Sequence, residues 1–259
     1  HYWHKHVNPN YVKPTPTPAM VLGDAFHVSL LEPDKFEEKF IVKESNKIVL
    51  GKLPLLRDVG RDAYEEAKQK QEALRVEKEK LEKQFEENSI DKIVINEDDY
   101  KKILMMKHEI LLNPTNKELI QDAQYEKSIF WIDPDTQLLC KARPDIWHNK
   151  FIVDLKTTVS AAENDFQRSI YNYGYHIQFG MIQEALKHVL NIEMKNFLFL
   201  PQEKEEPFLS AVYQLDEAAI EQGVTEFKNC LMQIKQCHET NNFPGYQTKM
   251  ISLPAWSNK

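Results

Sequence analysis

Two aspartates and a lysine stand close together near the middle of the sequence. Asp145 precedes Asp154 with eight residues between them, and Lys156 follows two positions later. Residues two apart on a β-strand share a face, so Asp154 and Lys156 should project together while Leu155 faces the core. Carboxylates and an amine arranged in this way can hold a hard cation and act on a phosphate ester.

A hairpin turn brings the first aspartate to the same face. With a turn centred on His148 and Asn149, Asp145 lies opposite Ile152 and therefore on the face of Asp154. Two close carboxylates repel each other, and a divalent cation relieves this repulsion better than one lysine does. Oxygen ligands of this kind select Mg²⁺, with Mn²⁺ as the expected substitute. The alternative is a surface hairpin with an ordinary cross-strand ion pair, which an isolated Asp-x-Lys would favour.

A cation held by these carboxylates can polarise a phosphodiester and lower the pKa of a bound water. Lys156 can then orient that water or neutralise charge that develops on the phosphate. We therefore expect phosphodiester hydrolysis by metal-activated water, in line and without a covalent enzyme intermediate.

Helix and strand patterns surround this window. The expected helices cover 19–31, 62–88, 96–112, a short segment ending near 122, 163–190 with a break near Gly174, and 216–239. The expected strands cover 92–95, 125–132, 138–146, 151–157, 196–200 and 208–214. Helices around a hairpin-rich sheet indicate an α/β or α+β architecture.

The helix expected over 62–88 is unusually charged. Its apolar positions 67, 74, 81 and 85 follow heptad spacing, but the interleaved positions 71 and 78 are Gln and Lys. An apolar stripe that is interrupted in this way does not form a coiled coil. It predicts a solvated helix that lies on the body or projects from it. We expect one domain over residues 1–259, with a charged helical insertion around 62–90.

Composition excludes several classes of protein. The chain has 259 residues, is 42% hydrophobic and has a net charge of −7, which argues against a basic fold that coats DNA. No stretch approaches the roughly 18 consecutive apolar residues of a membrane span. The first residues lack the pattern of a secretory signal, and the three cysteines suggest a reducing compartment, so we expect a cytoplasmic protein. Because the chain does not begin with Met, we expect it to be trimmed or excised from a longer one.

The window around the two aspartates resembles a known superfamily. Pro144-Asp145 followed by Asp154-x-Lys156 is the signature of the PD-(D/E)xK nucleases. Further stretches resemble their RecE, or exonuclease VIII, branch from phages and prophages: 22–27 with 30–33, 128–131 through 140–143, 171–178, and 252–256. The resemblance implies a restriction-endonuclease-like core, with a central mixed β-sheet flanked by helices.

The resemblance also implies an activity and partners. It suggests a metal-dependent exonuclease that degrades one strand of linear double-stranded DNA from its 5′ end during recombination. It further implies a ring-shaped homo-oligomer, often a tetramer, and a single-strand annealing protein as partner. A structure-specific endonuclease with the same residues and a non-catalytic DNA-binding or assembly subunit remain the alternatives.

Other candidate ligands gain their roles from the resemblance. On that basis neutral His27 is a metal ligand beside Asp145 and Asp154, although a lone helical histidine is more often a core residue. Glu126 matches an acidic position of the family and is a candidate for a second-metal or water-mediated ligand. The main-chain carbonyl of Leu155 is a further oxygen donor, since it lies between the two motif side chains.

Four residues are spaced as one stripe on a helix: Arg168, Tyr171, Tyr175 and Gln178. An aromatic stripe is more often part of a core, but a Tyr hydroxyl can reach a phosphate while its ring packs. We expect this stripe to position the scissile strand, with Arg168 on a phosphate. Arg143 and Lys141 share the face of Asp145 by alternation and can also serve the phosphate, although a salt bridge explains them as well.

Overall fold

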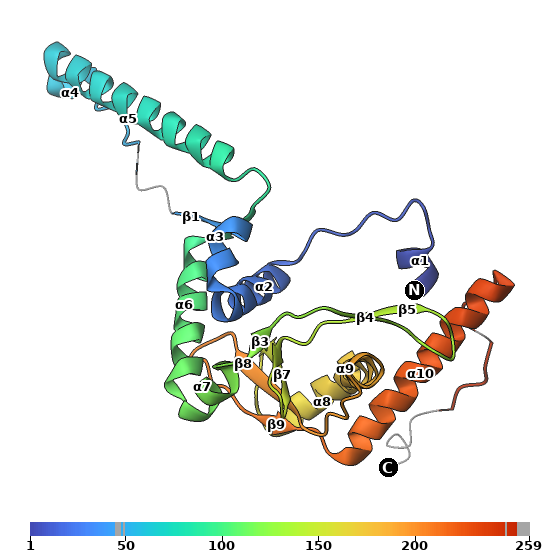
Figure 1. Cartoon of the computed structure of the whole chain (residues 1–259). Coiled ribbons are helices and arrows are strands. Elements are labelled where there is room, and N and C mark those ends of the chain that lie inside the picture. The colour runs from blue at the N-terminus through green and yellow to red at the C-terminus, as the bar shows by residue number, and fades with distance from the viewer. Residues whose placement is uncertain (45–47, 49, 247, 253–259) are drawn as a thin grey trace.

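A five-stranded mixed sheet forms the centre of the protein (Figure 1). The computed structural model describes residues 1–44, 48, 50–246 and 248–252. The strands follow one another across the sheet in the order β3 (Gln124–Tyr125), β6 (Ile146–Trp147), β7 (Ile152–Thr158), β8 (Phe197–Glu203) and β9 (Tyr213–Gln214). β7 and β8 are parallel, and the other neighbours are antiparallel.

Both faces of this sheet are buried. Val153 and Leu155 of β7 pack into a first core with helices α2 (Pro18–Leu31), α6 (Glu97–Leu112) and α7 (Pro114–Ile120). Ile152 of β7 and its β8 neighbours Phe197 and Phe199 pack into a second core with α8 (Glu163–Tyr173), α9 (Tyr175–Leu190) and α10 (Glu217–Thr240). The expected sheet between helices is confirmed, but the face that carries Asp154 is covered as well.

Local sequence signals place the helix ends. The side chain of Asn96 accepts a hydrogen bond from Asp99 N at the start of α6, and Asp216 caps α10 in the same way. Gly174 has φ of 66°, a left-handed conformation that ends α8 and turns the chain into α9. The predicted starts of these two helices and the predicted break near Gly174 are therefore confirmed.

Two expected strands are divided between sheets. Residues 125–132 split into β3 and β4 (Ile129–Ile132), and residues 138–146 split into β5 (Leu139–Ala142) and β6. β4 and β5 form their own antiparallel hairpin. Glu126, with φ of 52°, breaks the first strand, and Pro144, which has no N–H to donate, follows the end of β5. The expected strand over 208–214 is also shortened to β9.

The charged insertion projects from the body in Figure 1. It leaves through β1 (Phe40–Lys43), which pairs in parallel with β2 (Ile93–Asn96), and contains α4 (Leu56–Val59) and α5 (Arg61–Asn88). β1 has no counterpart among the expected strands. No residue of α5 is buried, as expected for a solvated helix. We call residues 50–92 the arm.

The remaining elements are short and include α1 (Tyr2–His6), the 3-10 turn η1 (Pro33–Lys35) and α3 (Phe36–Lys39). In the part of the chain that the structure describes, no helix combines the length and apolarity that crossing a bilayer requires. The family-like stretch 252–256 lies, except for Ser252, outside the described residues.

Candidate metal centre

A cleft of ≈ 580 Å³ opens beside the end of β7. It lies where α2 approaches the sheet, and its lining includes His27, Glu126, Asp145, Lys156 and Tyr175. These residues come from five separate segments of the chain, so the cleft exists only in the folded protein.

Gly23 allows α2 to come this close to β7. A Cβ atom built at Gly23 would lie 2.9 Å from the Thr157 hydroxyl oxygen, closer than a real contact allows. The missing side chain therefore sets the distance between α2 and β7. His27, one helical turn further along α2, is thereby brought against the ends of the strands.

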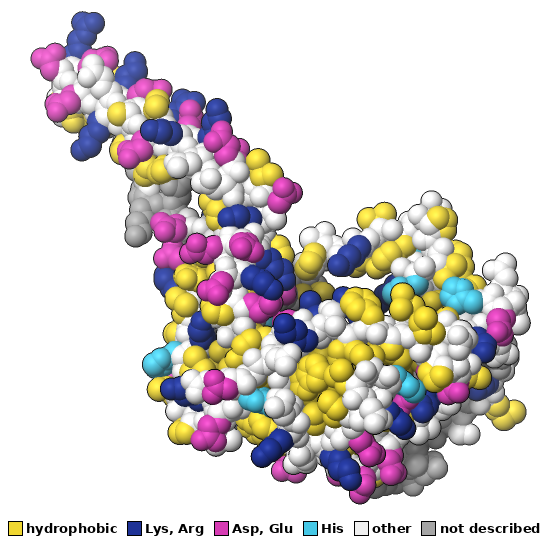
Figure 2. Space-filling view, in the orientation of Figure 1, with side chains coloured by type: hydrophobic (Ala, Val, Ile, Leu, Met, Phe, Trp, Pro, Cys, Tyr) yellow, Lys and Arg dark blue, Asp and Glu magenta, His cyan; other side chains and the backbone are white. Residues whose placement is uncertain are grey.

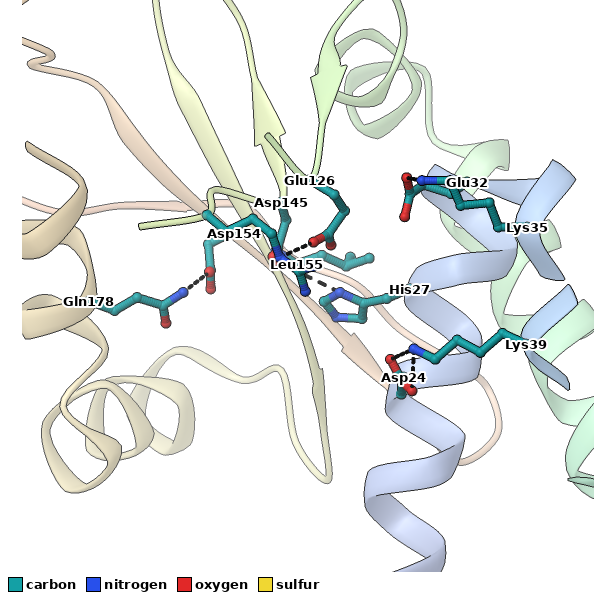
Figure 3. Close-up of polar contacts among 11 residues, drawn as sticks. Asp24, His27, Glu32, Lys35, Lys39, Glu126, Asp145, Asp154, Leu155 and Gln178 are labelled. Atoms are coloured by element: carbon teal, nitrogen blue, oxygen red, sulfur yellow. Dashed lines mark hydrogen bonds and ion pairs between the residues drawn. The ribbon is translucent and has the colours of Figure 1, made fainter. Parts of the chain in front are cut away.

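Three ligand-type side chains meet in the cleft. One ligand atom each of His27, Glu126 and Asp145 lies within 4.8 Å of the others, and His27 Nδ1 is 3.8 Å from Asp145 Oδ2. The backbone holds Asp145 in place, because Leu155 N donates to its Oδ2 at 2.9 Å and Glu126 N donates to its carbonyl at 3.0 Å. Figure 3 shows His27 reaching this group from α2, across from the strands.

Asp154 lies beside this group, on the side of α9. Its Oδ1 accepts a hydrogen bond of 2.8 Å from Gln178 Nε2, and its Oδ2 is 2.5 Å from Lys156 Nζ. Gln178 also accepts a hydrogen bond of 3.2 Å from Lys156, whose ammonium lies 4.8 Å from the centre of the Tyr175 ring. Gln178 thus bridges the aspartate and the lysine, as Figure 3 shows for the aspartate.

Burial governs the acid–base properties of the centre. Desolvation, aided by the charge of Lys156, lowers the pKa of His27 to about 4, so its ring is neutral at neutral pH. Burial raises the pKa of Glu126 to about 7, and Asp145 adds to this shift. Burial also raises the pKa of Asp154 to about 6 and raises the pKa of Asp145. Desolvation opposes the charge on Lys156, but its attraction to both aspartates outweighs this and raises its pKa.

The donor set fits a divalent cation. Among the described residues, the buried oxygens Glu126 Oε2 and Asp154 Oδ2 have no geometrically complete hydrogen bond, and each is held by one ion pair, to Arg143 Nε at 2.7 Å and to Lys156 Nζ at 2.5 Å. A neutral imidazole and several carboxylate oxygens can coordinate Mg²⁺ or Mn²⁺, and unsatisfied oxygens gain most from such a charge. The Leu155 backbone, which hydrogen-bonds to the His27 ring, borders the same cleft.

The register of the hairpin differs from the prediction. Trp147 pairs with Ile152 and Ile146 pairs with Val153, so the turn is centred on Asn149 and Lys150. The predicted turn at 148–149 is wrong by one residue. Asp145 lies in the bend before β6, where its carboxylate accepts a strand N–H, and its near neighbours are His27 and Glu126.

The predicted helical stripe is divided by the break at Gly174. Tyr175 lines the cleft, and Gln178 contacts Asp154 and Lys156. On α8, Arg168 pairs with Asp165 at 3.7 Å, and Tyr171, 73% exposed, lines a separate groove. The left-handed turn means that residues 168–178 do not share one continuous face.

The two basic residues before Asp145 also separate. Arg143 lines the cleft, with its Nε 2.7 Å from Glu126 Oε2. Lys141 does not line it and lies over the Phe130 ring. The salt-bridge alternative for Arg143 is therefore present in the structure.

Sequence reasoning missed several charged residues of the cleft: Asp24, Glu32, Lys35, Lys39 and Lys204. Lys39 pairs with Asp24 at 2.7 Å, and Lys35 pairs with Glu32. Lys204 follows β8, which runs parallel to β7, so a correct parallel pairing would have placed it near the motif. Asp24 and Glu32 lie in the family-like stretches 22–27 and 30–33, whereas Lys35 and Lys39 have no sequence signal apart from their closeness to His27 along the chain.

Comparisons with known proteins agree with this fold. Among solved structures, a protein from Eubacterium rectale named "Putative exonuclease" is similar with a TM-score of 0.57, at 12% identity, over 97% of this chain and 83% of that one. Identity this low shows a common fold alone. A second structure, of SSO0001, gives a TM-score of 0.29 at 16% identity, over 51% of this chain and 59% of that one, and carries no argument. No protein with a curated description matches the sequence significantly.

A family match covers nearly the whole sequence. Residues 4–252 match the family described as "PDDEXK-like domain of unknown function (DUF3799)". The span includes α2, the divided hairpin strands and β7, and so contains every residue of the candidate centre. This chain is therefore a member of the PDDEXK-like family DUF3799 and has the PD-(D/E)xK fold.

Proposed function

We propose that this chain is an Mg²⁺-dependent exodeoxyribonuclease that degrades one strand of linear double-stranded DNA. The observation that carries the proposal is the meeting of His27, Glu126 and Asp145 in a cleft that also holds Lys156. A 5′ to 3′ direction and a role in phage-type recombination rest on the sequence resemblance. The fold similarity to a protein named as an exonuclease supports the class of reaction.

The residues of the centre have different roles in the proposed reaction. His27, Glu126, Asp145 and Asp154, with the Leu155 carbonyl, would hold the cation, which supplies charge to polarise the phosphodiester and acidify a water. Lys156 presents a fixed ammonium to the cleft, because Asp154 and Gln178 bind it from one side and the Tyr175 ring lies against it. A fixed positive charge of this kind stabilises negative charge that develops on a phosphate.

Nucleotide release from linear duplex DNA with Mg²⁺ tests the proposal. Asp154→Asn keeps the shape of the side chain and removes its charge, and we expect it to reduce release by roughly 100-fold or more. Asp58→Asn, in the exposed arm helix α4, is the matched control and should leave the rate unchanged. Thermal unfolding shows that each variant is folded. Equal release by the wild type and Asp154→Asn contradicts a nuclease.

The ends of the substrate distinguish the alternatives. An exonuclease digests open linear duplex and spares the same sequence closed by hairpin caps, whereas a structure-specific endonuclease cuts the capped form. Labels at the 5′ or the 3′ end then give the polarity. DNA binding without metal-dependent release identifies a non-catalytic subunit.

Oligomeric state and partner belong to the same proposal. The resemblance alone suggests a ring-shaped homo-oligomer such as a tetramer, acting in the cytoplasm with a single-strand annealing protein. Light scattering during size-exclusion chromatography measures the mass of the particle, and a monomer would contradict the ring.

A further inference from the structure

The β4–β5 hairpin begins and ends at the candidate metal centre. β4 starts three residues after Glu126, and β5 ends three residues before Asp145. The inner face of the hairpin packs into the second core through Ile129, Trp131, Cys140 and Ala142. The hairpin is therefore a firmly anchored extension of the sheet region that carries the centre.

The outer face of this hairpin is apolar and exposed. We call Phe130, Ile132, Leu139 and Lys141 the outer face. Phe130 is 58% exposed, Ile132 62% and Leu139 75%, although such residues usually lie inside a protein. Phe130 pairs across the strands with Lys141, whose ammonium lies 5.3 Å from the ring centre.

The outer face carries one charge, the positive charge of Lys141, in a protein that is negative overall, and the turn between its two strands contains Asp133 and Asp135. The net charge of the chain is −7, yet the outer face holds no acidic residue. Residues 1–17, which contain Lys5, Lys13 and three histidines but no Asp or Glu, arch over the hairpin in Figure 1. Figure 2 shows hydrophobic side chains gathered on the surface beneath this N-terminal segment.

We propose that the outer face is a binding platform for unpaired bases of a single DNA strand that passes the metal centre. The inference rests on the proposed nuclease function and extends it to a second contact with the substrate. A single strand exposes flat apolar bases together with phosphates, and an aromatic ring beside a lysine suits both. Continuity with the cleft through Arg143 favours this occupant over a second copy of the chain or an unrelated protein.

Binding of a fluorescent single strand of about 16 nucleotides, measured by anisotropy in EDTA, tests the platform separately from cleavage. Phe130→Ala should weaken binding roughly tenfold, the loss expected for one stacked base, whereas Phe130→Trp should preserve it. Lys141→Ala should lower the slope of log affinity against log salt by about 0.7. Leu209→Ala, at a 57% exposed position outside this face, is the control and should leave affinity unchanged.

The outcomes separate this inference from the proposed function. Equal single-strand affinity of wild type and Phe130→Ala, with normal nucleotide release, overturns the platform alone. Phe130-dependent binding by a protein that releases no nucleotide with Mg²⁺ overturns the nuclease and supports the platform. If Phe130→Ala instead reduces the mass of an oligomer measured by light scattering, the face is an interface between copies, and the platform is overturned.

Discussion

The metal centre and the arm place charged residues in opposite environments. In the centre, Asp154 is 1% exposed, and burial raises the pKa values of Glu126, Asp145 and Asp154. In the arm, no residue of α5 is buried, and its ion pairs join residues one turn apart on the surface, such as Arg75 and Glu79 at 3.0 Å. Buried like charges are costly, whereas solvated pairs are nearly neutral in free energy.

The difference in burial between these two sets of charges indicates that the centre is arranged for its chemistry at a cost in stability. Carboxylates that repel each other inside a protein destabilise it unless a cation joins them. The arm carries even more charge but none of this strain. Substitutions that remove charge should therefore have large effects on activity and stability in the centre and negligible effects in the arm.

The largest effect should follow from Asp145→Asn. Asparagine can still accept the hydrogen bond from Leu155 N, so the bend before β6 should survive. Nuclease activity should fall by more than roughly 100-fold, because removing a charged ligand costs more than removing a residue that only supports one. The midpoint of thermal unfolding without metal should rise, since the desolvation cost of the Asp145 carboxylate, which outweighs its attraction to Lys156 and Arg143, disappears together with its effect on Glu126.

Glu77→Gln in α5 is the matched control for that variant. Glu77 is exposed, and its replacement should change neither the rate nor the unfolding midpoint. An Asp145→Asn protein that is active, or less stable than wild type in EDTA, would contradict the view that the centre is held under electrostatic strain.

Gly23→Ala should have the next largest effect. The added methyl would lie 2.9 Å from the Thr157 hydroxyl oxygen, so α2 must move away from β7 and take His27 with it. We expect about tenfold lower nuclease activity, since displacements of about 1 Å in an active site are costly. The double variant Gly23→Ala/Thr157→Ala should recover activity in a double-mutant cycle.

Gly51→Ala provides the comparison outside the body. A Cβ at Gly51 meets nothing within 4 Å, so this variant should behave as wild type. Additive effects of the Gly23 and Thr157 substitutions would show that their contact does not set the position of α2.

Local signals in the sequence predicted much of the fold. The starts of the helices near 96 and 216, the break at Gly174 and the alternation along β7 all depend on near neighbours in the chain. β1 could not be predicted, because its partner β2 lies beyond the whole arm, and four residues carry no pattern that specifies a distant partner. The predicted register of the β6–β7 hairpin is wrong because residues 148–150 allow the turn at more than one position.

The types of residue in the centre could be predicted from the sequence, but the contacts between them could not. The Asp145, Asp154 and Lys156 spacing indicated a metal site, and the family resemblance added His27 and Glu126. Alternation placed Asp154 on one face of β7 but gave no sign that α9 covers that face with Gln178. Such contacts depend on helix packing, which leaves little trace in the spacing of single residues.

The pH dependence of metal affinity should be the third largest effect. Glu126, with a pKa of about 7, and Asp154, with a pKa of about 6, hold protons that a cation must displace. Mg²⁺ affinity should therefore fall as pH is lowered from about 8 to about 6, by up to tenfold per unit for each proton displaced. His27, with a pKa of about 4, does not compete in this range.

Titration calorimetry in two buffers of different ionisation enthalpy measures both the affinity and the protons released. A Glu126→Gln variant should show a weaker pH dependence, and Glu77→Gln should match wild type. If Mg²⁺ affinity stays constant between about pH 8 and about pH 6, the carboxylates are already ionised without metal. The buried carboxylates of the centre would then titrate like the exposed ones of the arm, and the contrast between the two regions would be wrong.

Removing the arm should have the smallest effect. Replacing residues 50–88 by a flexible linker of about 12 residues leaves enough chain to join the parallel strands β1 and β2. The deletion removes weak surface interactions with the body, such as that of the Lys43 ammonium with the Phe85 ring, whose centre is 5.8 Å away. Nucleotide release from a short duplex should stay within about twofold of wild type, because α5 contributes no buried residue.

The unfolding midpoint and light scattering complete this test. A small change in midpoint at unchanged mass means that the arm is separable from the fold that supports the centre. A loss of activity greater than about tenfold would show that the arm's solvated charges act on the substrate or on a second copy. The contrast between a strained centre and a neutral arm would then fail, because exposed charge would serve the reaction as directly as the buried carboxylates do.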